Sequence, residues 1–205
     1  MKNLFPSPRL RGEGRVRGSW AQLVLCAPLL LAGSTQASTI EAADFQYHQR
    51  SYTYRYSSLL DGRFDRVHAI VTDYSGMTRL NDSFLSSEVL AELEDARIER
   101  RLVIRSCVWW FCFNLKMVEM LTTLPNGDIQ ADIVPEQSSF RRGSTTWRVE
   151  HVGDKQTRIT ITGSQTPDFW IPPIIGPALL KKQFLREAAE TIGNIERLAN
   201  VEAVQ

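Results

Sequence analysis

The sequence predicts an α+β domain in which one long C-terminal helix lies across a curved antiparallel sheet. Three observations predict this class. Apolar residues recur with helical spacing in 63–75, strand-like segments joined by turns fill 83–164, and a long apolar stripe runs through 173–199. We therefore expect about seven strands, with two short helices after the first strand.

Residues 1–37 have the pattern of a secretory signal peptide, and residues 38–205 are expected to form a single domain. A basic stretch containing Arg9 and Arg17 precedes an apolar run at 21–32, and small residues follow it up to Ala37. That apolar run is shorter than the roughly 20 residues of a membrane span. The pattern predicts cleavage after Ala37 and a periplasmic or secreted protein.

Charge and cysteine content support these predictions. The whole chain has 24 basic and 23 acidic residues, and removal of the five basic and one acidic residue of 1–37 leaves 19 and 22. A mature chain with a net charge of −3 does not favour binding to nucleic acid through a basic surface. Cleavage also removes Cys26, so Cys107 and Cys112 remain as an even pair in an oxidising compartment and predict a disulfide.

The first elements follow from residue periodicity. Residues 45–58 are predicted to form one strand with Tyr52, Tyr54 and Tyr56 on the same face. A change to helical spacing predicts a helix over 63–75, followed by a short helical or irregular stretch.

The rest of the sheet is predicted as a series of antiparallel strands. These strands cover 83–93, 97–106, 113–123, 129–138, 144–151 and 157–164. Pro135 predicts a bulge or an edge position within 129–138. A helix over 173–199 completes the domain, with a proline at its start.

Three consecutive aromatic residues, Trp109, Trp110 and Phe111, lie between the two cysteines. An offset of five places Cys107 and Cys112 on opposite faces of a continuous strand, so a bridge requires a turn between them. Exposing large aromatics forfeits about 1.5–3 kcal/mol of burial each. Either this turn presents them to a lipid, ligand or partner, or it folds back onto the core.

Other aromatics fall in turns that a meander would bring to the same end of the sheet. We expect a rim or gate there, formed by Trp109, Trp110, Phe111, Phe140, Arg141, Arg142, Phe169 and Trp170. Arg141 and Arg142 are suited to an anionic headgroup or acidic tail, or form an ordinary solvated turn.

The layout resembles the START-like, or helix-grip, superfamily, in its polyketide cyclase/dehydrase and coenzyme Q-binding branch. The resemblance rests on the helix 64–74, Arg79-Leu80-Asn81, the turn 139–143, Trp147 and the segment 167–173. It implies a sheet wrapped around the last helix with an apolar cavity between them. Its candidate lining residues are Tyr52, Tyr54, Tyr56, Leu102, Ile104, Leu185, Ala188 and Ile192.

The sequence contains no pattern that predicts a catalytic site, a metal site or a cofactor. Glu119 and Asp132 are expected to be a solvated pair on neighbouring strands. The favoured hypothesis is an exported binding protein for a hydrophobic, lipid-like ligand held between sheet and C-terminal helix, with transient contact to a membrane surface. The alternative is a polyketide cyclase or aromatase acting in the same cavity.

Overall fold

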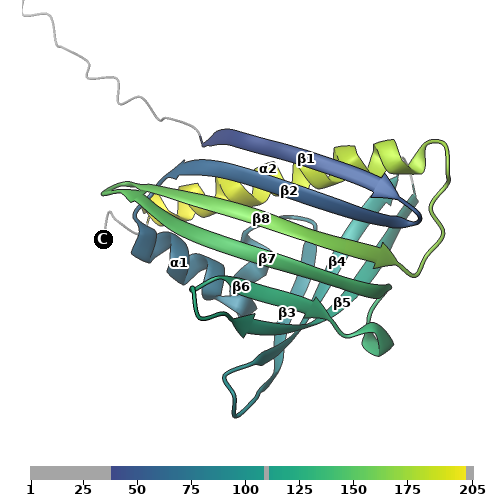
Figure 1. Ribbon diagram of the computed structural model, residues 1–205, viewed down its shortest axis with the longest axis horizontal. Coiled ribbons are helices and arrows are strands. Elements are labelled where there is room, and N and C mark those ends of the chain that lie inside the picture. The colour runs from purple at the N-terminus through teal and green to yellow at the C-terminus, as the bar shows by residue number, and fades with distance from the viewer. Residues whose placement is uncertain (1–37, 109–110, 202–205) are drawn as a thin grey trace, which may run out of the picture. The chain divides into compact units, whose positions relative to one another are not determined.

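The computed structural model describes residues 38–108 and 111–201. Within them the elements follow one another along the chain as labelled in Figure 1. In order they are β1 (Thr39–His48), β2 (Ser51–Asp61), α1 (Phe64–Thr72), the 3-10 helix η1 (Tyr74–Arg79), β3 (Phe84–Glu92), β4 (Ile98–Val108), β5 (Phe111–Thr123), β6 (Ile129–Ile133), the 3-10 helix η2 (Pro135–Gln137), β7 (Phe140–Gly153), β8 (Gln156–Pro167) and α2 (Gly176–Val201).

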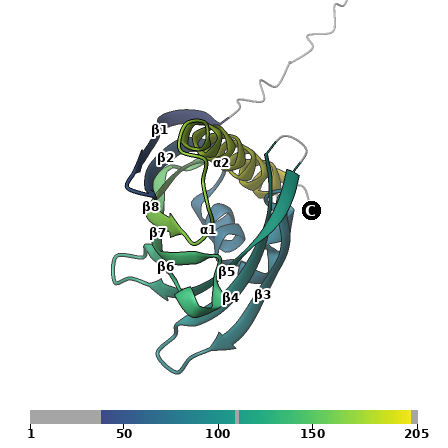
Figure 2. The same cartoon turned by 90° about the vertical axis from the view of Figure 1, so that its right-hand side faces the viewer.

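The strands of the described residues form one antiparallel sheet with the order β1-β2-β8-β7-β6-β5-β4-β3. The sheet curves around α2, and α1 lies inside the curve as well (Figure 2). This arrangement confirms the predicted class, a curved antiparallel sheet around a long C-terminal helix, with eight strands in the sheet.

The prediction of one strand over 45–58 is wrong, because β1 and β2 form a hairpin there. Gln49 and Arg50 connect the strands with φ values of 49° and 66°. Two successive residues with positive φ form the turn whose twist suits a two-residue hairpin. Glycine or asparagine usually marks such a turn in a sequence, and neither occurs here. The hairpin therefore lacks its usual signal and adds the eighth strand.

The turn predicted around Phe140 also lies elsewhere, because β7 already begins at Phe140. Pro135 lacks a backbone N–H, and it follows the end of β6 and begins η2. Ser138 and Ser139 then attach the segment between η2 and β7 to β5, because their hydroxyls accept hydrogen bonds from the backbone N–H groups of Val118 and Lys116. The segment that follows is strand, and Phe140 at its start is buried.

The inner face of α2 is packed against the core at its C-terminal end and borders a cavity at its N-terminal end. Towards its C-terminal end Ile192 and Ile195 are completely buried, in the same core cluster as Val67 and Ile70 of α1. Asn81 fixes the chain after η1 to the same helix, because its side-chain amide donates to the carbonyl of Glu187 and the hydroxyl of Thr191. The N-terminal half of α2 instead borders a cavity.

Candidate functional site

A cavity of about 230 Å³ lies between the sheet and the N-terminal half of α2. Strands from both halves of the sheet and the helix α2 contribute side chains to its wall. The lining residues include Phe45, Tyr52 and Tyr54 from β1 and β2; Arg100, Leu102, Ile104, Leu115, Met117 and Glu119 from β4 and β5; Phe140, Thr145, Trp147, Ile161 and Gln165 from β7 and β8; and Leu180, Gln183, Phe184, Glu187, Ala188 and Thr191 from α2. The wall is mostly apolar, with a few polar groups at defined positions.

Aromatic rings form the wall on the side of β1 and β2. Phe184 of α2 packs between Phe45 and Tyr54, with ring centroids 5.7 and 4.6 Å away. Burial raises the pKa of both Tyr52 and Tyr54. Their hydroxyls are held by neighbouring wall residues, since Tyr52 donates to Gln165 and Tyr54 is 2.6 Å from the Thr145 hydroxyl. These tyrosines therefore stay neutral and present ring surface.

Gly163 allows Tyr54 to take this position. A Cβ atom at residue 163 would lie 2.6 Å from both the Tyr54 hydroxyl oxygen and the Ser144 carbonyl oxygen. Contacts that short are not tolerated, so a side chain here would displace the ring. The absence of a side chain at Gly163 thus sets the shape of the wall.

A buried ion pair is the main polar feature of the cavity. Arg100 and Glu119 face each other across β4 and β5, with 2.5 Å between Nη2 and a carboxylate oxygen. Their side chains are only 7% and 4% exposed. The Nε–H of Arg100 has no hydrogen-bond partner, and its guanidinium lies over the Tyr74 ring at 5.8 Å. An unpaired buried donor of this kind is costly, so it marks a position where a ligand acceptor would be stabilised.

The expected solvated pair of Glu119 and Asp132 is therefore wrong. Glu119 is opposite Ile133 in the register, while Asp132 is opposite Met120. Because successive residues of a strand point to opposite faces, the two carboxylates lie on different sides of the sheet. Asp132 accepts a hydrogen bond from Gln130 instead.

The sequence does carry a signal for this pair. Ile98, Arg100, Leu102 and Ile104 share one face of β4, so a single cation interrupts an apolar series with a period of two. The same face of β5 carries Leu115, Met117, Glu119 and Leu121, which has a single anion. A charge inside each of two neighbouring apolar series indicates an inward-facing ion pair.

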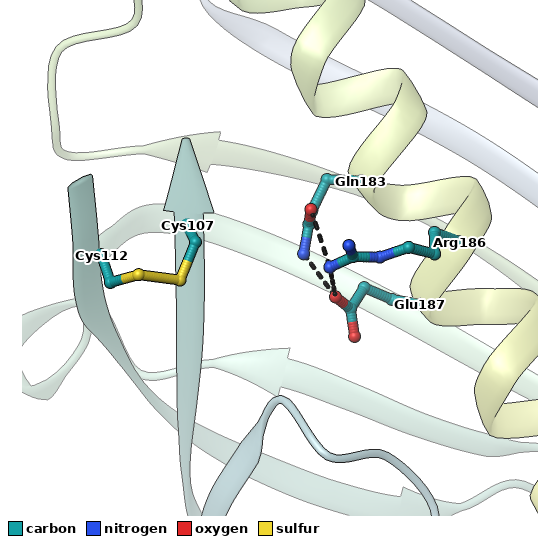
Figure 3. Close-up of a disulfide and its surroundings, with 5 residues drawn as sticks. All are labelled: Cys107, Cys112, Gln183, Arg186 and Glu187. Carbon is teal, nitrogen blue, oxygen red and sulfur yellow. Dashed lines mark hydrogen bonds and ion pairs between the residues drawn. A yellow bond between two sulfur atoms is a disulfide. The ribbon is translucent and has the colours of Figure 1, made fainter. Parts of the chain in front are cut away.

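Polar side chains of α2, among them Gln183 and Glu187, line the cavity together with Ser83, which precedes β3. Glu187 accepts hydrogen bonds from Gln183, from Arg186 at 3.0 Å and from the Ser83 hydroxyl at 2.5 Å. Figure 3 shows Gln183, Arg186 and Glu187 projecting from the helix on the side of the disulfide-linked strands. This polar part of the wall contrasts with the apolar part formed by the aromatic and aliphatic side chains.

Cys107 and Cys112 form the predicted disulfide, which joins directly opposite residues of β4 and β5. The bridge closes the outer part of the hairpin that leads to residues 109 and 110 (Figure 3). It therefore links the two strands that carry Arg100 and Glu119.

The predicted lining residues divide into two groups. Tyr52, Tyr54, Leu102, Ile104 and Ala188 line the cavity. Tyr56, Leu185 and Ile192 do not, which corrects their assignment as lining residues.

Packing beyond the hollow part of the domain explains this difference. Tyr56 is 2% exposed and Ile192 is completely buried within the core cluster. Leu185 is half-buried and packs against the same cluster. The period-two and helical patterns identify the inner face of each element but not how far the hollow region extends along it.

The predicted rim is also only partly assembled. Trp109, Trp110 and the side chain of Phe111 lie outside the described residues. Phe140 is 3% exposed and lines the cavity, so it lies inside the domain and not at the surface. Phe169 packs against its ring at 5.9 Å, whereas Trp170 is 75% exposed.

The two rim arginines contact neighbouring residues of the domain. Arg141 forms an ion pair with Asp168 at 2.6 Å, and Arg142 donates to the Thr166 hydroxyl at 3.1 Å. Both side chains therefore help to hold the end of β8. In the part of the chain described, no cluster of three or more His, Cys, Asp or Glu residues is arranged to hold a metal ion.

A curved sheet that encloses a long helix and an apolar cavity defines a helix-grip, START-like domain. The family described as polyketide cyclase/dehydrase and lipid transport matches residues 35–200. The chain belongs to that family, as the sequence resemblance implied. No curated protein sequence matches the chain.

Several solved structures share the fold at low sequence identity. The Zhui aromatase/cyclase from Streptomyces sp. R1128 has a TM-score of 0.61 and 14% identity, covering 73% of this chain and 94% of that one. A START superfamily protein from Mycobacterium smegmatis has a TM-score of 0.59 and 14% identity, covering 71% and 98%. A STAR-related lipid transfer protein from Xanthomonas axonopodis has a TM-score of 0.54 and 14% identity, covering 75% and 98%. These similarities show the fold.

Proposed function

We propose that this protein is an exported carrier of an apolar, lipid-like molecule that bears one polar acceptor group. The observation that carries the proposal is the unpaired Nε–H of Arg100 in a cavity walled mostly by aromatic and aliphatic side chains. The apolar part of the ligand would occupy the space between sheet and helix. Its acceptor would receive the hydrogen bond that Arg100 offers.

The cavity volume limits how much of a ligand is enclosed. An apolar cavity of about 150 Å³ holds one benzene molecule, and this cavity has about 230 Å³. One ring system or a short length of acyl chain would fit inside. A larger lipid would extend beyond the cavity, and we expect it to do so past the polar lining residues Ser83 and Glu187.

Export is the second part of the proposal. The signal-peptide pattern of residues 1–37 supports it, and so does the Cys107–Cys112 disulfide, because such bonds persist in oxidising compartments. A carrier in the periplasm would shield the apolar part of its ligand from water.

One observation supports a cyclase as the second candidate. Arg100 and Glu119 place a cation and a carboxylate inside the cavity, where they would polarise a carbonyl group. Turnover of a synthetic poly-β-ketone by the purified protein, abolished by Arg100→Met, would establish this alternative. Unchanged poly-β-ketone in the presence of the protein would contradict it.

Filling the cavity tests the binding function directly. Ala188 lines the cavity and is 8% exposed, so an indole in Ala188→Trp would project into the ligand space. Ala189, the next residue, is exposed, so Ala189→Trp adds the same side chain outside. We expect Ala188→Trp to abolish binding of the neutral probe N-phenyl-1-naphthylamine and to remove lipid adducts from native mass spectra. Ala189→Trp should retain both.

The fold of each variant is checked independently, because overpacking costs about 1–3 kcal/mol. Circular dichroism spectra matching the parent show that Ala188→Trp is folded. Undiminished probe binding by that folded variant would refute ligand binding in this cavity. If the variant unfolds, Ala188→Leu provides a smaller obstruction and should weaken probe binding in proportion to the volume filled.

A further inference from the structure

The segment that joins β8 to α2 exposes large apolar side chains. Ile174 is 91% exposed, Trp170 is 75% exposed and Ile175 is 46% exposed. Leaving such side chains in water forfeits about 1.5–3 kcal/mol of burial each. Three of them within six residues form an apolar patch of the kind that marks an interaction site.

Contacts with the body of the domain hold the backbone of this segment in place. Phe169 packs on Phe140 at 5.9 Å, and Ile171 lies so close to the start of α2 that a Cβ on Gly176 would be 2.3 Å from its Cγ2 atom. The N–H of Gly176 also donates to the carbonyl of Pro172 at 2.8 Å. Anchored residues thus lie on both sides of the exposed ones, and the domain holds Trp170 and Ile174 outward.

Positive charge lies next to this apolar segment. Lys181 and Lys182 are exposed on the first turns of α2, and Arg186, which is paired with Glu187, follows one turn later. Between 168 and 186 the only acidic residue is Asp168, so these 19 residues carry three positive charges and one negative. Asp168 is itself paired with Arg141. An apolar patch bordered by cations is complementary to the surface of an anionic bilayer.

The helix turns that carry the two lysines also border the cavity. Leu180, Gln183 and Phe184 line the cavity from the same turns of α2 that carry Lys181 and Lys182 outward. One short stretch of helix therefore has a ligand-facing side and a basic outer side. Contact of the outer side with a bilayer would bring the cavity close to the lipid surface.

We propose that residues 170–182 dock the protein on the surface of an anionic lipid bilayer. Trp170, Ile174 and Ile175 would enter the interfacial layer, where the indole ring is well accommodated. Lys181 and Lys182 would remain at the level of the headgroups. Among the residues described, no helix is long and apolar enough to cross a membrane.

Co-sedimentation with vesicles tests this proposal. The vesicles contain phosphatidylglycerol and phosphatidylcholine, and vesicles of phosphatidylcholine alone serve as the neutral reference. We expect the parent to bind the anionic vesicles, and Ile174→Asp to bind them at least about tenfold more weakly, because an apolar anchor is lost. Ile40→Asp is the matched control, since Ile40 is 53% exposed at the opposite end of the domain. This control should bind like the parent.

A second pair of variants isolates the charge contribution. Each lysine near an anionic surface contributes about 1 kcal/mol, so Lys181→Gln/Lys182→Gln should weaken binding about 30-fold. Lys155→Gln, in the turn between β7 and β8 at the far end, should have no effect. Raising the salt concentration should weaken the parent and abolish the difference between the parent and the double variant. All variants retain the same residues 1–37, so any contribution of that segment cancels.

Several results would overturn the proposal. The first is equal vesicle binding by the parent and Ile174→Asp, and the second is no binding by the parent. A third is sedimentation velocity without vesicles showing that Ile174→Asp dissociates a dimer, which would identify the partner as a second copy of the chain. Binding of N-phenyl-1-naphthylamine without vesicles is measured in parallel. Retained probe binding by Ile174→Asp separates loss of docking from loss of the ligand cavity.

Discussion

Replacing Glu119 by glutamine measures the energetic contribution of the buried pair in the cavity. Glu119→Gln preserves the size of the side chain and an oxygen that accepts a hydrogen bond, but it removes the charge opposite Arg100. Because the two side chains are 7% and 4% exposed, the guanidinium would remain buried without a counterion. Breaking a buried pair from one side costs about 3–5 kcal/mol. The retained hydrogen bond places our expectation at the lower limit of this range.

Urea unfolding followed by tryptophan fluorescence gives the free energy of unfolding. A slope of about 2 kcal/mol/M converts the expected loss into a midpoint shift of about 1.5 M. Glu88→Gln is the matched control, because Glu88 pairs with Arg101, the residue next to Arg100. Those side chains are 57% and 41% exposed, so this change should cost less than about 1 kcal/mol.

A double substitution separates charge burial from general damage. Arg100→Met/Glu119→Leu leaves neither charge in the cavity and should return the free energy of unfolding to within about 1 kcal/mol of the parent. It also removes the donor that we assign to the ligand acceptor, so this variant should bind a purely apolar probe but bind an acceptor-bearing ligand more weakly. Should Glu119→Gln be as mild as Glu88→Gln, the pair is hydrated and the argument for a buried polar anchor fails.

Two further predictions concern the disulfide and the tyrosines. Peptide mass spectrometry of unreduced protein should recover Cys107 and Cys112 linked by a disulfide. Reduction should lower the free energy of unfolding by only about 2 kcal/mol, because the closed loop is short. Recovery of both cysteines as free thiols would contradict the pairing. Burial raises the pKa of Tyr52 and Tyr54, so the unfolded chain loses these protons first and stability should fall as the pH rises above about 10, the pKa of an unfolded tyrosine. Tyr52→Phe should reduce the steepness of this alkaline loss, and an unchanged slope would show that the hydroxyl is accessible to water.

The sequence predicted the fold well where the signals are local. Period-two alternation in 157–164 lies within β8, and the helical stripe of 173–199 corresponds closely to α2 at Gly176–Val201. Each signal reports which face of a segment is buried, and that face is determined by neighbours in the sequence. The β1–β2 hairpin was missed because its turn uses Gln49 and Arg50, which carry no turn preference.

The candidate site was predicted less completely, because a cavity depends on contacts between distant segments. Phe140 appeared to belong to a turn, but the serine hydrogen bonds to β5 draw the chain into β7 and direct the ring inward. Arg100 and Glu119 would have been found by comparing the inward-facing positions of neighbouring strands. That comparison needs the register of β4 and β5, which the cysteine pair supplies once the disulfide is assumed.

The two halves of α2 contribute differently to the stability of the domain and to ligand binding. The C-terminal half packs tightly through Ile192 and Ile195, and the N-terminal half leaves the space beside Phe184 unfilled. A cavity lowers stability because its lining lacks contacts. Tight packing in the C-terminal half of α2 and the disulfide between β4 and β5 stabilise the domain, and so offset the loss of stability caused by the cavity. Substitutions at Ile195 should therefore reduce stability with little effect on ligand selectivity, whereas substitutions at Phe184 should alter ligand selectivity first.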